Sequence, residues 1–322
     1  MRKKLVVIVM SMCLLLCGCS KEEVMLSYSS DSNSVTLADL DDGGESQLFA
    51  ADLSVIPKGE DTGADEKLSA ESVLLVDATD NKAIYADNIY QKMYPASITK
   101  IVTALVALKN CNLDDVVVIS HNAANIKEDG AKLCGFKEGN QIVMRDLLSA
   151  FLVYSGNDAG VAIAEHVAGS VDKFADMMNE EAKELGAVGS HFVNPHGLHD
   201  DNHYTTAYDI YLFFNELTRN YGTFVDIISS GVVKINYKGT DGSPASRTFS
   251  STDRYLIGTQ TPPDGVTVIG GKTGTTSLAG SCLVLYSEGE NTHKYISVIL
   301  KAASGDDLFT QMNDLLSKIN ES

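Results

Sequence analysis

The chain has 322 residues, and 44% of them are hydrophobic, which is enough to bury the core of one large domain or of two subdomains that share a core. This composition excludes an intrinsically disordered protein. A net charge of −18 without clusters of basic residues argues against nucleic-acid binding, so no nucleic acid is expected among the partners.

The first eighteen residues are typical of a secretory signal. Arg2, Lys3 and Lys4 precede an apolar run from Leu5 to Leu16. Because the run is short for a membrane span, we expect a cleaved signal and not a transmembrane helix.

The signal region ends in Leu16-Cys17-Gly18-Cys19, which resembles the lipobox of bacterial lipoproteins. In that motif the peptidase cuts before the last cysteine, whose thiol carries a diacylglycerol. We therefore expect a signal peptide over residues 1–18 and lipidation at Cys19. The mature protein would be extracytoplasmic and lipid-anchored to the outer face of a bacterial membrane. An ordinary cleaved signal with incidental cysteines is the alternative.

Residues 19–67 carry a large share of the acidic excess. Between Lys21 and Lys67 there are twelve acidic and three basic residues, in a stretch that has no sustained apolar period. Such a segment repels itself and buries little apolar surface, so it predicts an acidic disordered tether. We place the catalytic domain at residues 68–322.

Three of the six cysteines fall in this catalytic domain: Cys111, Cys134 and Cys282. An odd number does not make a disulfide framework. The pattern favours buried free thiols, and a single bridge between Cys111 and Cys134 is the alternative.

The catalytic domain begins with a predicted β-hairpin. Val73–Asp77 and Ala83–Ala86 are apolar runs on either side of Asp80-Asn81-Lys82, whose residue types favour a turn. A helix is predicted next, from Ser97 to Lys109. Because it is apolar on nearly every side, we expect it to be buried.

The middle of the chain has mostly helical patterns. Helices are predicted over Met144–Val153 and Asp158–Val167. Ser170 is typical of the N-cap of a third helix that ends at Gly186, and Thr206 indicates the start of a fourth.

From about Val266 the pattern changes to strands, over Gly280–Tyr286 and Tyr295–Leu300, and Ser304 caps a last amphipathic helix. Strands near both ends predict one sheet that both termini complete, with a helical subdomain of about residues 110–250 beside it. Catalytic groups from the two parts would meet between them.

Three short strings occur in one order along the chain: Ser97-Ile-Thr-Lys100, Ser155-Gly-Asn157 and Lys272-Thr-Gly274. The first two strings are each common by chance, Lys-Thr-Gly is rarer, and none of the three is convincing alone. Together they match the motif set of class A β-lactamases and penicillin-binding proteins, and they predict a serine acyl-enzyme.

The chemistry assigns catalytic roles to three residues. Ser97 would be the nucleophile, and a spacing of three puts Lys100 on the same helix face one turn later. Lys100 must be neutral to act as a base, and burial together with the nearby cation of Lys272 would lower its pKa. Ser155 would bridge the two lysines and pass the proton to the leaving amine.

The other residues of the strings would bind the substrate. The amide of the second string would orient the catalytic lysine, and the backbone N–H groups of Ser97 and Thr275 would form an oxyanion hole. The cation and hydroxyls of the third string would hold a terminal carboxylate. The predicted substrate-binding residues are therefore Asn157, Lys272, Thr273, Gly274 and Thr275.

Longer stretches around the strings carry a family resemblance. Tyr94–Thr103, Tyr154–Ala159, Phe192–Leu198 and His203–Ala207 resemble the low-molecular-mass penicillin-binding D-Ala-D-Ala carboxypeptidases, and the match runs over roughly residues 72–301. The resemblance implies an α/β (α+β) fold, in which an antiparallel sheet of about five strands is flanked by helices and joined by a helical subdomain, as in serine β-lactamases and DD-peptidases.

The same resemblance implies a peptidoglycan stem peptide that loses its terminal D-Ala, and β-lactam antibiotics as covalent inhibitors. The sequence carries no sign of a cofactor. Many members of that family have a further β-rich domain and a C-terminal amphipathic anchor, whereas one helix is predicted after Ser304. We expect the lipid at Cys19 to replace that anchor.

A histidine-rich segment has the residue types of a metal site. It contains His191, His196, His199 and His203 with Asp200 and Asp201. Gly197 and Asn202 favour a loop, and the resemblance implies a structural loop beside the cleft, so no metal is expected.

Three other functions would use the same three strings or a similar set of residues. A β-lactamase needs a carboxylate for deacylation, usually in a Glu-x-x-Leu-Asn setting. The available glutamates, which lack that setting, are Glu165, Glu180, Glu181, Glu184 and Glu216. An endopeptidase that cuts D-Ala cross-links would differ only in what its pocket tolerates. A non-catalytic lipoprotein that binds β-lactams or cell-wall peptide is disfavoured because all three strings are intact.

Overall fold

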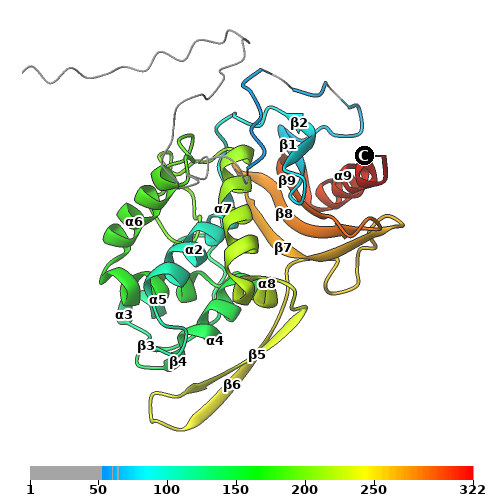
Figure 1. Cartoon of the computed structure of the whole chain (residues 1–322). Helices are drawn as coiled ribbons and strands as arrows, with labels where there is room; N and C mark the ends of the chain where they lie inside the picture. Colours follow the sequence, from blue (N-terminus) through cyan, green and yellow to red (C-terminus); the bar gives the residue numbers. More distant parts are fainter. Residues whose placement is uncertain (1–52, 60, 64, 322) are drawn as a thin grey trace, which may run out of the picture. The chain divides into compact units, whose positions relative to one another are not determined.

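The computed structural model describes residues 53–59, 61–63 and 65–321 (Figure 1). All of them belong to one compact unit, Leu48–Ser322. The predicted signal peptide, Cys19 and the tether as far as residue 52 lie outside the described residues. Within the described residues, no helix is long and apolar enough to span a membrane.

Five antiparallel strands form the main sheet, in the order β2-β1-β9-β8-β7. They are β1 (Ser72–Asp77), β2 (Lys82–Asp87), β7 (Val266–Thr276), β8 (Gly280–Gly289) and β9 (Lys294–Ala302). The central strands β1 and β9 come from opposite ends of the chain and pair from Ser72 with Leu300 to Asp77 with Tyr295. The predicted hairpin and the predicted sheet, completed by both termini, are confirmed.

The sheet is covered on both faces because alternate residues of a strand point to opposite sides. Val73 and Leu75 of β1 join a core with α9 (Gly305–Ser317), followed by η3 (Lys318–Glu321). Leu74 and Val76 join the larger core with the helices on the other face. Figure 1 shows α9 on one side of the sheet and α2 and α7 on the opposite side.

The helices between the strands follow the predicted order. They are η1 (Ala96–Thr99), α2 (Lys100–Asn110), α3 (His121–Ala124), α4 (Met144–Ser149), η2 (Ala150–Tyr154), α5 (Asn157–Ala168), α6 (Val171–Glu184), α7 (Ala207–Asn220) and α8 (Gly222–Ile228). As predicted, α2 is buried along most of its length. The side chains of Ser170, Thr206 and Ser304 accept hydrogen bonds from backbone N–H groups three residues later, so all three predicted N-caps are confirmed.

A second sheet of four strands lies within the predicted helical subdomain, in the order β3-β4-β5-β6. Its strands are β3 (Val116–Val118), β4 (Gln141–Val143), β5 (Val232–Lys238) and β6 (Pro244–Ser250). The mostly helical prediction is therefore wrong for residues 232–250. The two long strands bury few side chains, so their polar residues do not show the apolar alternation of a half-buried strand.

The packed region begins before Leu68, where the sequence placed the end of the tether. The backbone N–H of Ser54 donates to the hydroxyl of Tyr211 at 2.9 Å, and the hydroxyl of Tyr208 donates to the carbonyl of Ser54 at 3.0 Å. Further along, the backbone N–H of Ala86 in β2 donates to the hydroxyl of Thr62 at 2.9 Å. These contacts attach the described residues before Leu68 to α7 and to the edge of the main sheet.

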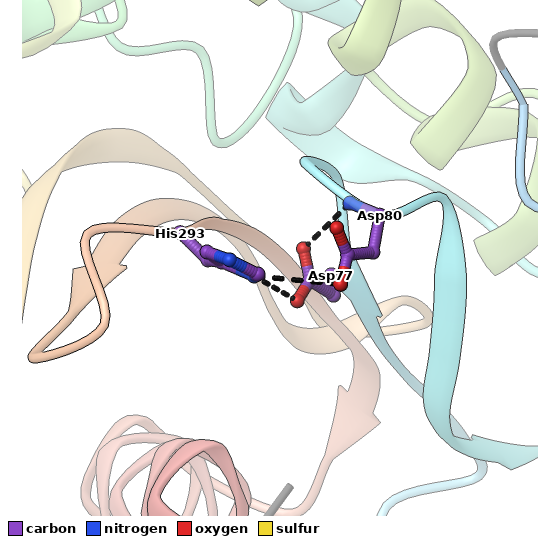
Figure 2. Close-up of side chains that lie close together, drawn as sticks. All are labelled: Asp77, Asp80 and His293. Atoms are coloured by element: carbon purple, nitrogen blue, oxygen red, sulfur yellow. Dashed lines mark hydrogen bonds and ion pairs between the residues drawn. The ribbon is translucent and has the colours of Figure 1, made fainter.

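Two turns at one end of the sheet are joined by Asp77, Asp80 and His293 (Figure 2). One carboxylate oxygen of Asp77 accepts the backbone N–H groups of Thr79 and Asp80, and the other lies 2.8 Å from Nδ1 of His293. This hydrogen bond raises the pKa of His293. The three side chains are close enough to hold a cation, but both oxygens of Asp77 already serve to connect the turns.

Cys111, Cys134 and Cys282 are free thiols, as the sequence favoured over a bridge. Cys134 and Cys282 are buried and Cys111 is half-buried. Burial raises the pKa of Cys111 and of Cys282 to about 11, so both thiols stay protonated at neutral pH.

Candidate active site

Ser97 lies in the tight turn that leads into α2. Residues 96–99 form a 3-10 turn, so the regular helix begins at Lys100, three residues later than predicted. Ala96, just before the serine, has φ of +48°, a left-handed conformation that costs a non-glycine residue about 1–3 kcal/mol. Such a conformation persists only where surrounding contacts hold it.

Hydrogen bonds from the histidine-rich segment hold this turn. The backbone N–H of Val193 donates to Nδ1 of His203 at 3.1 Å. Nε2 must then carry the proton, and it donates to Oγ1 of Thr99 at 2.7 Å. The Thr99 hydroxyl donates in turn to the carbonyl of Ala96 at 2.8 Å. Gly197 packs so tightly on that carbonyl that a Cβ would collide with it. The segment therefore supports the nucleophile through hydrogen bonds.

Lys100 is fully buried, and its side-chain nitrogen has three oxygen partners. Nζ lies 2.9 Å from Oγ of Ser97, 2.8 Å from Oδ1 of Asn157 and 2.7 Å from the carbonyl oxygen of His196. The amide and carbonyl oxygens can only accept, whereas the serine hydroxyl can also donate. When Lys100 is neutral, its two N–H groups stay with Asn157 and His196, and its lone pair faces Ser97.

The electrostatics favour this neutral form. Burial holds the pKa of Lys100 well below its usual value, and the cations of Lys272 and Lys132 lower it further. Burial and Lys132 also lower the pKa of Lys272, to about 7. The sequence predicts that Lys272 keeps its charge, and an anionic ligand beside it would raise this lowered pKa.

The second string joins two helices through a strained residue. The predicted helix over Met144–Val153 is split into α4 and the π-helix η2, and it ends at Ser155, which has φ of +74°. A Cβ on Gly156 would collide with the thiol of Cys134, so only glycine fits beside that loop. α5 then begins at Asn157, within reach of Lys100.

The predicted bridge through Ser155 is not formed. Ser155 is buried at the wall of the cleft. Within the part of the chain that the structure describes, its hydroxyl forms no hydrogen bond with Lys100 or Lys272. Lys100 is satisfied by Asn157 and His196, and Nζ of Lys272 donates to the carbonyl of Thr273 at 2.8 Å. The hydroxyl is therefore free to bind a substrate.

The third string lies on β7. Lys272 is buried, and Oγ1 of Thr273 donates to the hydroxyl of Thr252 at 2.6 Å. A Cβ on Gly274 would stand 2.9 Å from the carbonyl oxygen of Pro95 and 3.0 Å from the backbone nitrogen of Ser97. The missing side chain lets the strand backbone approach the serine, so that N–H groups of both can point at one oxygen.

A cleft of about 370 Å³ lies between two walls. We call residues 95–100 and 155–157 the helical wall, and residues 272–275 of β7 the strand wall. Six of the eight predicted site residues line the cleft: Ser97, Ser155, Asn157, Thr273, Gly274 and Thr275. Lys100 and Lys272 are buried directly behind them. The structure thus brings all eight residues together.

Sequence reasoning missed several groups of this cleft. Lys132, Thr252 and Arg254 line it, and the carbonyl of His196 accepts a hydrogen bond from Lys100. Arg254 is paired with Asp306 at 2.7 Å. None of these residues belongs to a recognisable string, and a backbone carbonyl has no residue signature at all.

The fold and the arrangement of these residues match one class of protein. The chain belongs to the peptidase S11 family of D-alanyl-D-alanine carboxypeptidases, whose model matches residues 59–304.

Comparisons with individual proteins support the same family. The chain is 30% identical over 258 residues to D-alanyl-D-alanine carboxypeptidase DacF of Bacillus subtilis, covering 77% of this chain and 61% of the relative. It is 29% identical over 221 residues to a D-alanyl-D-alanine endopeptidase of Pseudomonas aeruginosa, covering 68% and 67%. Penicillin binding protein 5 of Haemophilus influenzae matches with a TM-score of 0.68 and 27% identity, covering 79% of this chain and 72% of that structure. The chain thus spans about three fifths of the length of DacF.

Proposed function

We propose that this chain is a serine-type D-Ala-D-Ala carboxypeptidase, which removes the terminal D-Ala from peptidoglycan stem pentapeptides. The observation that carries the proposal is the 2.9 Å contact between Nζ of buried Lys100 and Oγ of Ser97. Fixed acceptors at Asn157 and His196 orient the lone pair of the neutral amine toward the serine. Family membership supports the choice of substrate.

Acylation would begin when Lys100 takes the proton of the Ser97 hydroxyl and Oγ attacks the carbonyl carbon of the penultimate D-Ala. The N–H groups of Ser97 and Thr275 would hold the resulting oxyanion. The C–N bond then breaks, and the proton passes from Lys100 to the leaving amine of D-Ala, with Ser155 as the relay once its free hydroxyl turns toward Lys100. The product is an ester between Ser97 and the shortened peptide.

Substrate recognition would come from the strand wall. The terminal carboxylate of the peptide would lie against Lys272, Thr273 and Thr275, and its charge would return the pKa of Lys272 toward its usual value. Deacylation would reverse the first step: a water gives its proton to Lys100 and attacks the ester, and Ser97 regains its hydrogen.

The test is mass spectrometry of the intact protein after a short penicillin pulse, together with an assay of free D-Ala release from a pentapeptide. We expect an adduct of one drug molecule and release of D-Ala for the wild type, and neither for Ser97→Ala. Labelling of the alanine variant would refute the assignment of the nucleophile. Labelling of the wild type without D-Ala release would indicate a non-catalytic receptor, and rapid multiple-turnover hydrolysis of penicillin would indicate a β-lactamase.

A DD-endopeptidase is the second candidate, favoured by the similarity to the endopeptidase of Pseudomonas aeruginosa. Both reactions use the same nucleophile and differ in whether the leaving amine belongs to free D-Ala or to a cross-linked chain. Cross-linked peptide dimers as substrates separate them, because a carboxypeptidase leaves the dimers joined.

The membrane anchor belongs to the same proposal. A diacylglycerol on Cys19 would hold the catalytic domain at the outer face of a membrane, with the acidic segment after it as a tether. Expression of the full chain with a labelled fatty acid should give a labelled protein in the membrane fraction. Cys19→Ser should lose both the label and the membrane association while purified protein keeps its penicillin binding.

A further inference from the structure

Lys132 is a third lysine in the cleft, and its backbone is firmly held. It lies in the segment between α3 and β4 (Figure 1). Its carbonyl accepts the backbone N–H of Asn157 at 2.7 Å. Just after it, the carboxylate of Asp158 accepts the backbone N–H groups of Cys134 and Gly135, both at 2.8 Å. Lys132 is therefore positioned from the helical wall, beside Asn157.

The side chain of Lys132 points toward the reacting groups. It lines the cleft with Ser97, and its ammonium lies 4.1 Å from the centre of the Tyr154 ring. It is close enough to lower the pKa of both Lys100 and Lys272. Burial lowers its own pKa as well.

No carboxylate of the described residues neutralises this ammonium. The carboxylate of Asp158 is used by backbone N–H groups, Asp253 is buried and acts on Lys272, and the other cation in the cleft, Arg254, already pairs with Asp306. Because the neutral form of Lys100 is favoured, Lys132 and Lys272 are the lysines of this cleft that can carry a positive charge, in a chain whose net charge is −18. The charge of Lys132 lowers the pKa of Lys272, and an anion bound beside Lys132 would relieve this repulsion.

Under the proposed function, the terminal carboxylate of the substrate already has its partners on the strand wall, at Lys272, Thr273 and Thr275. The backbone of Lys132 is instead tied to Asn157, next to the helical wall. An anion that pairs with Lys132 would then belong to the acyl part of the peptide. The penultimate D-Ala has only a methyl side chain, so the third residue of the stem is the first one that can carry a side-chain carboxylate.

We propose that Lys132 is a specificity-determining residue, which binds a free side-chain carboxylate on the third residue of the stem peptide. The inference rests on the proposed carboxypeptidase function. The enzyme then selects peptides whose third residue is an acidic diamino acid over peptides in which that carboxylate is amidated or absent.

The test compares kcat/KM for D-Ala release from three synthetic pentapeptides that differ only at the third residue: meso-diaminopimelate, its side-chain amide and L-lysine. The wild type should prefer the free carboxylate about five- to tenfold, mainly through KM, as expected for a partly exposed ion pair. Lys132→Gln should bring the ratio close to one, and Lys132→Arg should keep it. Lys127→Gln removes the same charge from the same segment outside this cleft and should leave the wild-type ratio.

The outcomes separate the possible roles of Lys132. If it acts only by lowering the pKa of Lys100, then Lys132→Gln shifts the acidic limb of the pH profile equally for all three peptides and leaves their ratio unchanged, which overturns the inference. A wild type that releases D-Ala equally from all three also overturns it. Absence of D-Ala release from every peptide, without a Ser97-dependent penicillin adduct, would overturn the proposed function itself. Penicillin acylation of each variant checks that its site is folded.

Discussion

The two walls of the cleft are built in different ways. On the helical wall, the groups around Ser97 are engaged, apart from the hydroxyl of Ser155: Lys100 has three oxygen partners, and His203 and Thr99 hold the turn that contains Ser97. On the strand wall, Lys272 donates only to the carbonyl of the next residue among the hydrogen bonds of the described residues.

This difference fits two separate roles, proton transfer on one wall and substrate binding on the other. A group that moves a proton must be held in one geometry before the substrate arrives, because misplacement by about 1 Å costs much of the rate. A group that binds the charge of the substrate contributes most to affinity when it has only weak contacts inside the protein to give up. We infer that the helical wall performs the chemistry and the strand wall performs recognition.

Removal of the base should have the largest effect. Lys100→Met should lower the rate of penicillin acylation and of D-Ala release by about 10³- to 10⁴-fold, because no other group is placed to take the Ser97 proton. Lys100→Arg should be equally inactive, since it keeps the charge but cannot lose a proton. Stopped-flow acylation rates measure both. Substantial activity in the arginine variant would mean that the cation, and not the lone pair, is what the reaction needs.

A side chain at the junction of the walls should have the next largest effect. In Gly274→Ala the new methyl group would press on Pro95 and Ser97 and displace the predicted oxyanion donors. We expect acylation to slow by about 10²- to 10³-fold, the usual cost of losing one such donor. Gly222→Ala is the matched control, because its Cβ meets nothing within 4 Å. Similar rates in both variants would show that the walls need not touch.

A substitution on the strand wall should weaken substrate binding more than it slows the chemical step. Lys272→Met should reduce kcat/KM for a D-Ala-D-Ala peptide about 10- to 100-fold, the range for a lost hydrogen bond to a charged group. A peptide with an amidated C-terminus should lose a similar factor with the wild type and little more with the variant. Additive losses would show that Lys272 and the terminal carboxylate do not interact.

The sequence predicted the parts of the site that chemistry restricts to certain residue types. The three strings contain the proposed nucleophile, the amine, the amide and the strand glycine, and the structure brings them together at one cleft. N-caps were also predictable, because a cap such as Ser170 or Ser304 acts on backbone groups only three residues away. The main sheet followed from its strongly apolar strands.

The other parts of the site and the second sheet could not be predicted, because no local sequence pattern reveals the contacts or the exposure that determine them. The partner of Lys100 at residue 196 is a backbone carbonyl, which every residue type supplies. Lys132 reaches the cleft only because Asn157 and Asp158 anchor its loop, across about 25 residues of sequence. The hairpin of β5 and β6 is mostly exposed, so burial did not impose an apolar alternation on it.

The smallest predicted effect concerns the acid sensitivity of the helical wall. Burial lowers the pKa of His196 and of His203 to about 3, whereas an exposed histidine titrates near about 6.5. Unfolding therefore takes up protons below about pH 6.5, so the stability that the neutral rings confer is complete above that pH. It is lost progressively as the pH falls toward 3.

His203→Gln should make this dependence visible. The variant loses the acceptor for Val193 and is less stable than the wild type at pH 7.5. Between pH 6.5 and 5.0, however, its free energy of unfolding should fall less steeply, by about 1.4 kcal/mol per pH unit, because one proton fewer is taken up. Urea denaturation at several pH values measures the slope. Equal slopes for the variant and the wild type would mean that the support of the turn at Ser97 does not depend on a neutral imidazole, and the contrast between a fixed helical wall and an open strand wall would then rest on Lys100 alone.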